Sequence, residues 1–237
     1  MANLLKFKMF ICKFLTCWIF LNKKRKLVRE FLYWFSFKDY KRFKNTNYYV
    51  VSLGNSCLSR ALLTAAGIKP RRFYGEVSCP FDLYFSTDIK RTIELIKNDF
   101  SDFFKNVDID AFPHDGYLTL NNFKVRYKKR IKNFLDIQKS NKIVYYVYSN
   151  YNEIPSIEDI TNLYKVIKSK RGAKPFKFIL LTSHKIDMQE IIQIPYEIDM
   201  NNSKAIEYII NRYKDYDNEY TAYYSYMKKE IEKIFSN

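Results

Sequence analysis

The amino-acid sequence predicts a three-layer α/β/α sandwich with a mostly parallel central sheet, preceded by a basic amphipathic helical arm. Two observations lead to this fold class: β-rich runs alternate with segments of helical periodicity, and most of the runs are apolar throughout. Strands covered on both faces have near-continuous apolar runs, and strands separated by helices form parallel βαβ units. We expect two domains, the arm in residues 1–45 and one α/β domain in residues 46–237.

The expected strands are four apolar runs, and Pro195 in the last of them favours a sheet edge: residues 48–53, 143–148, 176–181 and 191–198. Apolar side chains at three- to four-residue spacing predict the helices: residues 58–66, 89–103, 127–139, 203–213 and 218–235. A further helix is expected to begin near Ser156, which with Asp159 makes an N-terminal cap. Asn121 and Asn122 lie between two alternating runs and instead predict a small hairpin over residues 117–125.

Charge and composition exclude several functions. The chain has 237 residues and a net charge of +16, of which residues 1–45 hold +10. A basic arm on a nearly ordinary body disfavours a uniformly basic nucleic-acid-binding domain, so nucleic acid is not an expected partner. Four scattered cysteines and two histidines support neither a disulfide scaffold nor a metal centre. No cofactor fingerprint is present either, so we expect no metal and no bound cofactor.

The arm has the pattern of an interfacial helix. Lysines interrupt the apolar run of residues 4–21 and a basic cluster follows it, which disfavours both a cleaved leader and a membrane span. We expect residues 4–29 to dock on an anionic membrane surface, with the protein cytoplasmic and peripheral on the inner face of the membrane. The alternative is a helix that packs on its own domain with its lysines reaching solvent.

The turn after the first strand holds the strongest candidate for chemistry. The strand is expected to end at Leu53, Gly54 and Asn55 to form a tight turn, and a helix to start near Ser56 and Cys57. Ligands bind at the carboxyl ends of parallel strands, and the positive end of a helix dipole favours a thiolate. Cys57 is therefore a candidate nucleophile, with main-chain N–H groups of Asn55 or Ser56 as oxyanion donors. The alternative is a small buried apolar residue.

A thiol nucleophile needs a base and a group that orients the base. The chain offers His114, in a loop beside Asp115, and His184, at the expected carboxyl end of the third strand. Both remain open as the base, and each has the alternative of a surface or capping role. Asp82 lies amid apolar neighbours and needs a hydrogen-bonding partner, so it either orients the base or caps a helix.

Four blocks taken together resemble a bacterial family known as putative papain-like cysteine peptidases: SLGNSC (52–57), SCPFDL (78–83), HD (114–115) and VRYKKRIKNFLD (125–136). The resemblance runs from about residue 48 to residue 184. It implies a thiol-centred α/β domain with Cys57 as nucleophile and His114, beside Asp115, as its base. The chain departs from the family pattern at Cys79, where an aromatic residue is usual, and at Leu83, where tryptophan is usual.

The resemblance also implies structural or substrate-contacting roles for Asp82 and Arg130. Arg130 follows the HD block on an expected helix, where a guanidinium can hold a carboxylate or phosphate; the alternative is a surface role. Together with Ser78 it is a candidate substrate-binding residue.

Three functions fit these residues. The first is a cysteine peptidase or thiol hydrolase acting on an acyl or peptide bond through a Cys57–His114 dyad. The second is a coenzyme A-dependent acyltransferase of bacterial surface-polysaccharide biosynthesis, because the chain is similar to a capsule-biosynthesis family with a GNC-type turn and an HD loop. The third is a non-catalytic, membrane-docked interaction module. Hydrolase and acyltransferase need the same nucleophile, base and oxyanion donors, so both stay open.

Overall fold

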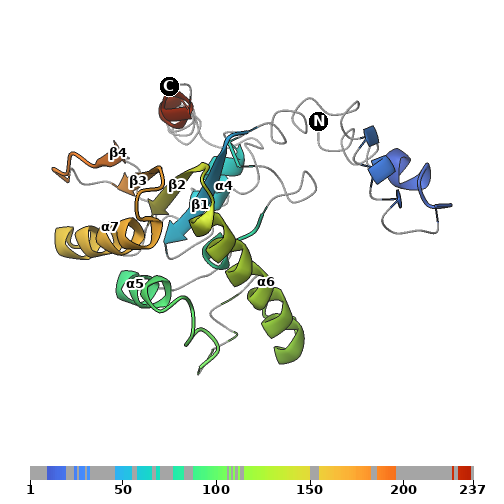
Figure 1. The fold of residues 1–237 in the computed structure, drawn as a ribbon, viewed down its shortest axis with the longest axis horizontal. Helices are drawn as coiled ribbons and strands as arrows, with labels where there is room; N and C mark the ends of the chain where they lie inside the picture. The colour runs from blue at the N-terminus through green and yellow to red at the C-terminus, as the bar shows by residue number, and fades with distance from the viewer. Residues whose placement is uncertain are drawn as a thin grey trace, which may run out of the picture. The chain divides into compact units, whose positions relative to one another are not determined.

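The computed structural model in Figure 1 divides the chain into two compact units, residues 1–46 and residues 47–237. It describes residues 10–19, 24–25, 27–29, 31–32, 46–54, 58–65, 68–69, 77–82, 88–105, 107, 109, 112, 115–149, 155–182, 186–195, 226 and 229–235. Several predicted features lie outside this set: the helix over 203–213 and the candidate residues Asn55, Ser56, Cys57, His114 and His184.

The second unit is built on a four-stranded sheet in which every neighbouring pair is parallel. The strands follow one another in sequence and in space: β1 (Tyr48–Gly54), β2 (Ile143–Ser149), β3 (Phe176–Thr182) and β4 (Ile191–Pro195). Gly54 pairs with Ser149, so β1 and β2 end together. The predicted α/β class is confirmed, and β4 is an edge strand, as its proline indicated.

Three helices cover one face of the sheet: α5 (Ile89–Lys97), α6 (Leu120–Lys139) and α7 (Ile157–Arg171). Figure 1 shows α5 beside α7. Phe134 of α6 packs against Tyr146 of β2, with ring centroids 6.4 Å apart. Aromatic residues bury about 150–250 Å² each, at roughly 25 cal/mol per Å², so this cluster is the main source of stability on that face.

The opposite face is covered by α4 (Leu58–Ala65) and by the helical residues 229–235. Phe235 packs on Tyr145 of β2 at a centroid distance of 4.2 Å, and Ile231 is fully buried. Tyr145 and Tyr146 are neighbours on one strand, so their side chains point to opposite faces. Helices on both faces of the sheet make the second unit a three-layer sandwich.

The predicted hairpin over residues 117–125 is wrong, because α6 begins at Leu120 and includes both asparagines. Thr119 is the N-cap, and its side-chain oxygen accepts a hydrogen bond from the N–H of Asn122. Phe123 lies one turn before Tyr127, and both are fully buried. The helical stripe therefore extends further towards the N-terminus than predicted, and its packing overrides the turn preference of two adjacent asparagines.

The second predicted helix, α5, ends at Lys97 rather than at residue 103. Asp99 and Phe100 have φ values of +49° and +61°, which terminate the helix. Phe100 and Phe103 nevertheless remain in the core beyond the helix end. The start of α7 agrees with the prediction: Ser156 is its N-cap and accepts a hydrogen bond from the N–H of Asp159 at 3.1 Å.

Arg171, in the last turn of α7, holds the side of the sheet at which the strands begin, called the amino edge below. Its guanidinium is fully buried and donates five hydrogen bonds of 2.7–3.1 Å to main-chain carbonyl oxygens of Ile137, Gln138, Ser140, Lys142 and Pro175. The first two carbonyls belong to the last turn of α6, where few main-chain donors remain; that of Ile137 also accepts the N–H of the C-cap residue Ser140. The last two immediately precede β2 and β3, so one side chain joins two helices and two strands.

The first unit contains helical residues 10–14, 24–25, 27–29 and 31–32. Within the described part of the chain, no helix is both long enough and apolar enough to cross a membrane.

Candidate active site

At the turn after β1, the ends of β1 and β2 approach each other closely. Gly54 has φ +113°, and a Cβ atom there would lie 1.8 Å from the main-chain oxygen of Ser149. Only glycine fits this conformation and this contact. In α4, the Ser59 hydroxyl donates to the Leu53 carbonyl at 3.0 Å and lies 2.7 Å from the Ser149 hydroxyl. The segment with Cys57, which directly precedes α4, therefore connects two fixed points.

A buried ion pair adjoins β1. Lys69 donates to one carboxylate oxygen of Asp82, and its ammonium lies 3.4 Å from the Ser52 hydroxyl. The second carboxylate oxygen accepts the Cys79 N–H at 2.7 Å and closes the turn of η2 (Pro80–Asp82). Lys69 and Asp82 are both fully buried. Asp82 thus has the partner that its apolar surroundings require, and that partner is a lysine that the sequence did not single out.

Asp115 fastens the HD loop to α6. Its carboxylate accepts hydrogen bonds from Arg126, from Arg130 at 2.7 Å and from the Tyr127 hydroxyl at 3.0 Å. Burial by itself raises the pKa of this carboxyl group. The charge of Arg130 and the hydrogen bonds of all three partners outweigh that effect and hold the pKa below its ordinary value. Asp115 is therefore a charged anchor in the folded protein.

The two arginines on α6 explain each other's position. Arg126 and Arg130 are four residues apart, so they lie on one helix face and repel each other unless an anion lies between them. Asp115 supplies that anion. Arg130 is buried, so its surface alternative is wrong, and the carboxylate that it holds is that of Asp115. The sequence contained a signal for this site, a pair of like charges at helical spacing next to HD.

Helix α6 also holds the SCPFD loop, one turn further along. The Asn133 side chain donates to the Ser78 carbonyl at 2.9 Å, and Phe134 packs on Phe81 with centroids 6.1 Å apart. Arg130 precedes Phe134 by four residues, about 6 Å of helix rise. Consecutive turns of one helix thus fix the loops that carry Asp82 and Asp115.

His114 lies between two anchored residues. On one side, Phe112 is fully buried and packs against the rings of Phe123 and Tyr127 at 4.8 and 4.9 Å. On the other side, Asp115 is held by the α6 arginines. His114 thus lies, along the chain, between two residues that the fold holds in place, Phe112 and Asp115.

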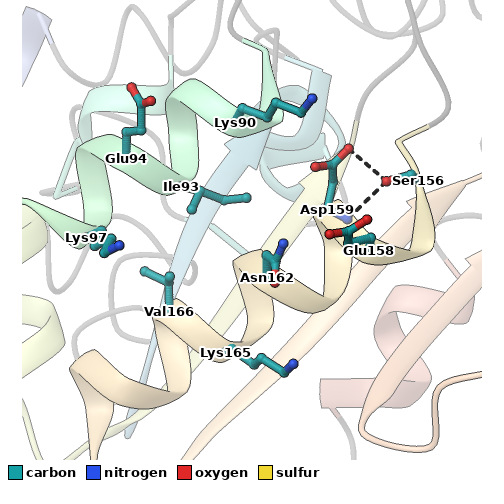
Figure 2. Close-up of a pocket in the computed structure, with 10 residues that line it drawn as sticks. All are labelled: Lys90, Ile93, Glu94, Lys97, Ser156, Glu158, Asp159, Asn162, Lys165 and Val166. Carbon is teal, nitrogen blue, oxygen red and sulfur yellow. Dashed lines mark hydrogen bonds between the residues drawn. The ribbon is translucent and has the colours of Figure 1, made fainter.

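A separate groove of about 550 Å³ runs between α5 and α7 (Figure 2). Lys90, Ser156 and Asp159 lie at one end, and Ile93 and Val166 contribute apolar side chains to it. Both basic and acidic side chains line the groove, and none of the described candidate site residues is among them. The groove is therefore distinct from the loops that α6 holds.

Free cysteines and metal ligands add little to the described site. Cys12, Cys17 and Cys79 are free thiols, and Cys79 is buried beside Asp82. In the part of the chain that the structure describes, no three histidine, cysteine or acidic side chains gather as metal ligands do.

These features define a class of protein: a parallel α/β domain in which the SCPFD loop is held beside β1, the HD loop is held by α6, and a cysteine directly precedes a helix. Residues 48–112 match the sequence model of a family described as putative papain-like cysteine peptidase (DUF1796). This match agrees with the predicted resemblance over residues 48–112, which include Cys57 and Asp82. The HD and VRYKKRIKNFLD blocks lie beyond the matched residues. No curated protein and no solved structure matches the chain significantly.

Proposed function

We propose that this protein is a cysteine-nucleophile hydrolase in which Cys57 attacks an acyl or peptide carbonyl and His114 is the base. One observation carries the proposal: described residues close to both candidates along the chain are held by the fold, Gly54 and Ser59 near Cys57, Phe112 and Asp115 near His114. Preorganisation of this kind is what a nucleophile and its base need. The family match over residues 48–112 supports the same kind of chemistry.

The proposed reaction has two steps. The Cys57 thiolate forms a bond to the carbonyl carbon, and main-chain N–H groups of Asn55 or Ser56 stabilise the oxyanion. The oxyanion collapses, the bond to the leaving group breaks, and protonated His114 gives that group its proton. Water then attacks the thioester, and the carboxylic acid leaves as the thiol returns to Cys57. The position of Cys57 before α4 favours the thiolate in the first step.

The anchoring residues act through the loops in this proposal. Asp115 is a positioning residue, because its carboxylate is already bound by α6 rather than directed at a substrate. The Lys69–Asp82 pair positions the SCPFD loop against β1. The Ser78 carbonyl accepts a hydrogen bond from Asn133, so the main chain at Ser78 is held by α6; we keep its hydroxyl as a candidate substrate contact.

An acyl probe tests the proposal. Incubation with p-nitrophenyl acetate should release nitrophenol and leave an acetyl group on Cys57, found by mass spectrometry. Cys57→Ala should abolish both, whereas Cys17→Ser, at an exposed thiol of the first unit, should change neither. Acetylation confined to Cys17, with turnover unchanged in Cys57→Ala, contradicts the thiol mechanism. Protection of Cys57 by coenzyme A would favour the acyltransferase over the hydrolase.

A further inference from the structure

We propose that the first unit docks on an anionic lipid surface through an outward apolar ridge, defined as Phe10, Phe14 and Trp18, with basic side chains beside it. The ridge does not depend on the chemistry proposed for Cys57.

The ridge is continuous and exposed. Phe10 and Phe14 are four residues apart in helical residues 10–14, so they share one side of the helix, and Trp18 follows in the turns after it. They are 64%, 66% and 70% exposed, and the rings of Phe10 and Phe14 stack at 6.3 Å. Single exposed apolar residues are ordinary, but a row of large aromatic side chains marks an interaction surface.

The other side of the same segment is small and polar. Cys12 and Thr16 are its buried residues. The Thr16 hydroxyl donates to the Cys12 carbonyl at 2.9 Å and accepts the Arg29 Nε–H at 2.7 Å. A helix that packs on a protein core buries its large apolar side chains, whereas this one turns them outward. The contacts within the first unit therefore select an outward ridge.

The charges beside the ridge select the partner. Lys13 and Lys24 are exposed, and Arg25 is oriented by a 2.7 Å hydrogen bond from its Nε–H to the Ile19 carbonyl. Residues 1–45 carry a net charge of +10. Aromatic side chains with adjacent lysines fit the interface of an anionic bilayer, where rings enter the headgroup region and ammonium groups meet phosphates. Nucleic acid offers the phosphates without an apolar phase for three exposed aromatic residues.

The indole of Trp18 is already prepared for such an interface. Its N–H donates to the Leu15 carbonyl at 2.7 Å, so the ring can leave water without losing a hydrogen bond.

Vesicle flotation of the full chain tests the docking surface. We expect the protein to float with phosphatidylcholine vesicles that contain about 30% phosphatidylglycerol, and not with pure phosphatidylcholine. Phe14→Ser with Trp18→Ser, and separately Lys13→Gln with Lys24→Gln, should each weaken binding about tenfold. The matched control is Val125→Ser with Ile157→Ser, two exposed apolar residues of the second unit, which should bind as the parent does.

A second readout follows insertion directly. With Trp34→Phe as background, emission from Trp18 should shift to shorter wavelength on anionic vesicles. An unshifted emission, or flotation that survives both arm variants, overturns the proposal. A change of oligomeric state in the Phe14→Ser, Trp18→Ser variant, with no vesicle binding by the parent, also overturns it and assigns the ridge to a second copy of the chain.

Discussion

Different kinds of contact hold the sheet at its amino edge, where the strands begin, and at the carboxyl end of β1. At the amino edge, Arg171 binds five main-chain carbonyl oxygens and, among the described residues, no carboxylate. Near the carboxyl end of β1, Lys69 binds the side chains of Asp82 and Ser52. A contact to a main-chain carbonyl does not depend on which side chain that residue carries, so Arg171 holds helix ends and strand starts in general. A contact between two side chains instead fixes one particular loop. The difference assigns Arg171 to the fold and Lys69 to the candidate site.

Removal of Arg171 should have the largest effect. Arg171→Leu removes the guanidinium donor from five main-chain carbonyls, of which those of Ile137 and Pro175 also accept a main-chain N–H, from Ser140 and Val144. We expect a loss of about 3–5 kcal/mol in the free energy of unfolding. Lys168→Leu, an exposed position in the same last turn of α7, is the control and should stay within about 0.5 kcal/mol. Urea denaturation measures both. Equal stability of the two variants would show that Arg171 does not fasten the amino edge.

Breaking the buried pair should come next. Asp82→Asn leaves the Lys69 ammonium buried without its counter-ion and should cost about 3 kcal/mol. The double variant Asp82→Asn with Lys69→Met should recover part of that loss, because no unpaired charge remains. A double-mutant cycle in urea measures the coupling. If the losses simply add, the two residues do not act as a pair.

Substitution in the Lys69–Asp82 pair also distinguishes residues that support the candidate site from residues that support only the fold. Asp82→Asn should slow alkylation of Cys57 in the fraction that remains folded, because the SCPFD loop loses its hold on β1. Arg171→Lys, which keeps a buried cation at the amino edge, should leave that rate unchanged. Equal slowing in both variants would remove the distinction between the two edges.

Asp115 gives a pH-dependent effect of roughly 2 kcal/mol. Its pKa is lower in the folded than in the unfolded protein, so the carboxylate stabilises the fold above the unfolded pKa, and this is lost as the pH falls through the folded pKa. Asp115→Asn should be less stable at neutral pH, with the difference shrinking in acid. Asp136→Asn, at an exposed carboxylate of α6, is the control. A difference that stays constant with pH contradicts this assignment.

Ser59 should have the smallest effect, about 1 kcal/mol. Ser59→Ala removes the hydrogen bond to the Leu53 carbonyl and leaves the Ser149 hydroxyl without that partner. Thr64→Val is the control on the same helix, because the Thr64 hydroxyl has no hydrogen-bond partner among the described residues, and we expect no loss there. Thermal unfolding compares them; a larger loss in Thr64→Val would contradict the account of α4.

The strands were predictable because burial on both faces leaves a continuous apolar run, as in β2 and β3. The start of α6 was not, because adjacent asparagines are typical of turns and only the packing of Phe123 makes that stretch helical. Lys69 and Arg171 were missed for a common reason. Basic residues usually face solvent, and nothing in the sequence around Lys69 or Arg171 shows that the fold buries them against acceptors.

Within the candidate site, the sequence predicted where residues lie along the chain better than it predicted which side chains contact one another. The place of Cys57 after a buried strand and before a helix follows from local pattern alone. The anchoring of Asp115 by two arginines depends on a helix that begins after the HD block, and the hairpin prediction hid it. The like-charged pair Arg126 and Arg130 was the signal that could have revealed this contact.

The most direct test of the central claim is the rate of alkylation at each cysteine as a function of pH, read by mass spectrometry in the parent and in His114→Ala. We expect Cys57 alone to react fast below about pH 7, and the variant to lose that low-pH reactivity. An ordinary thiol titration at Cys57, or the same profile in both proteins, would contradict the proposed dyad.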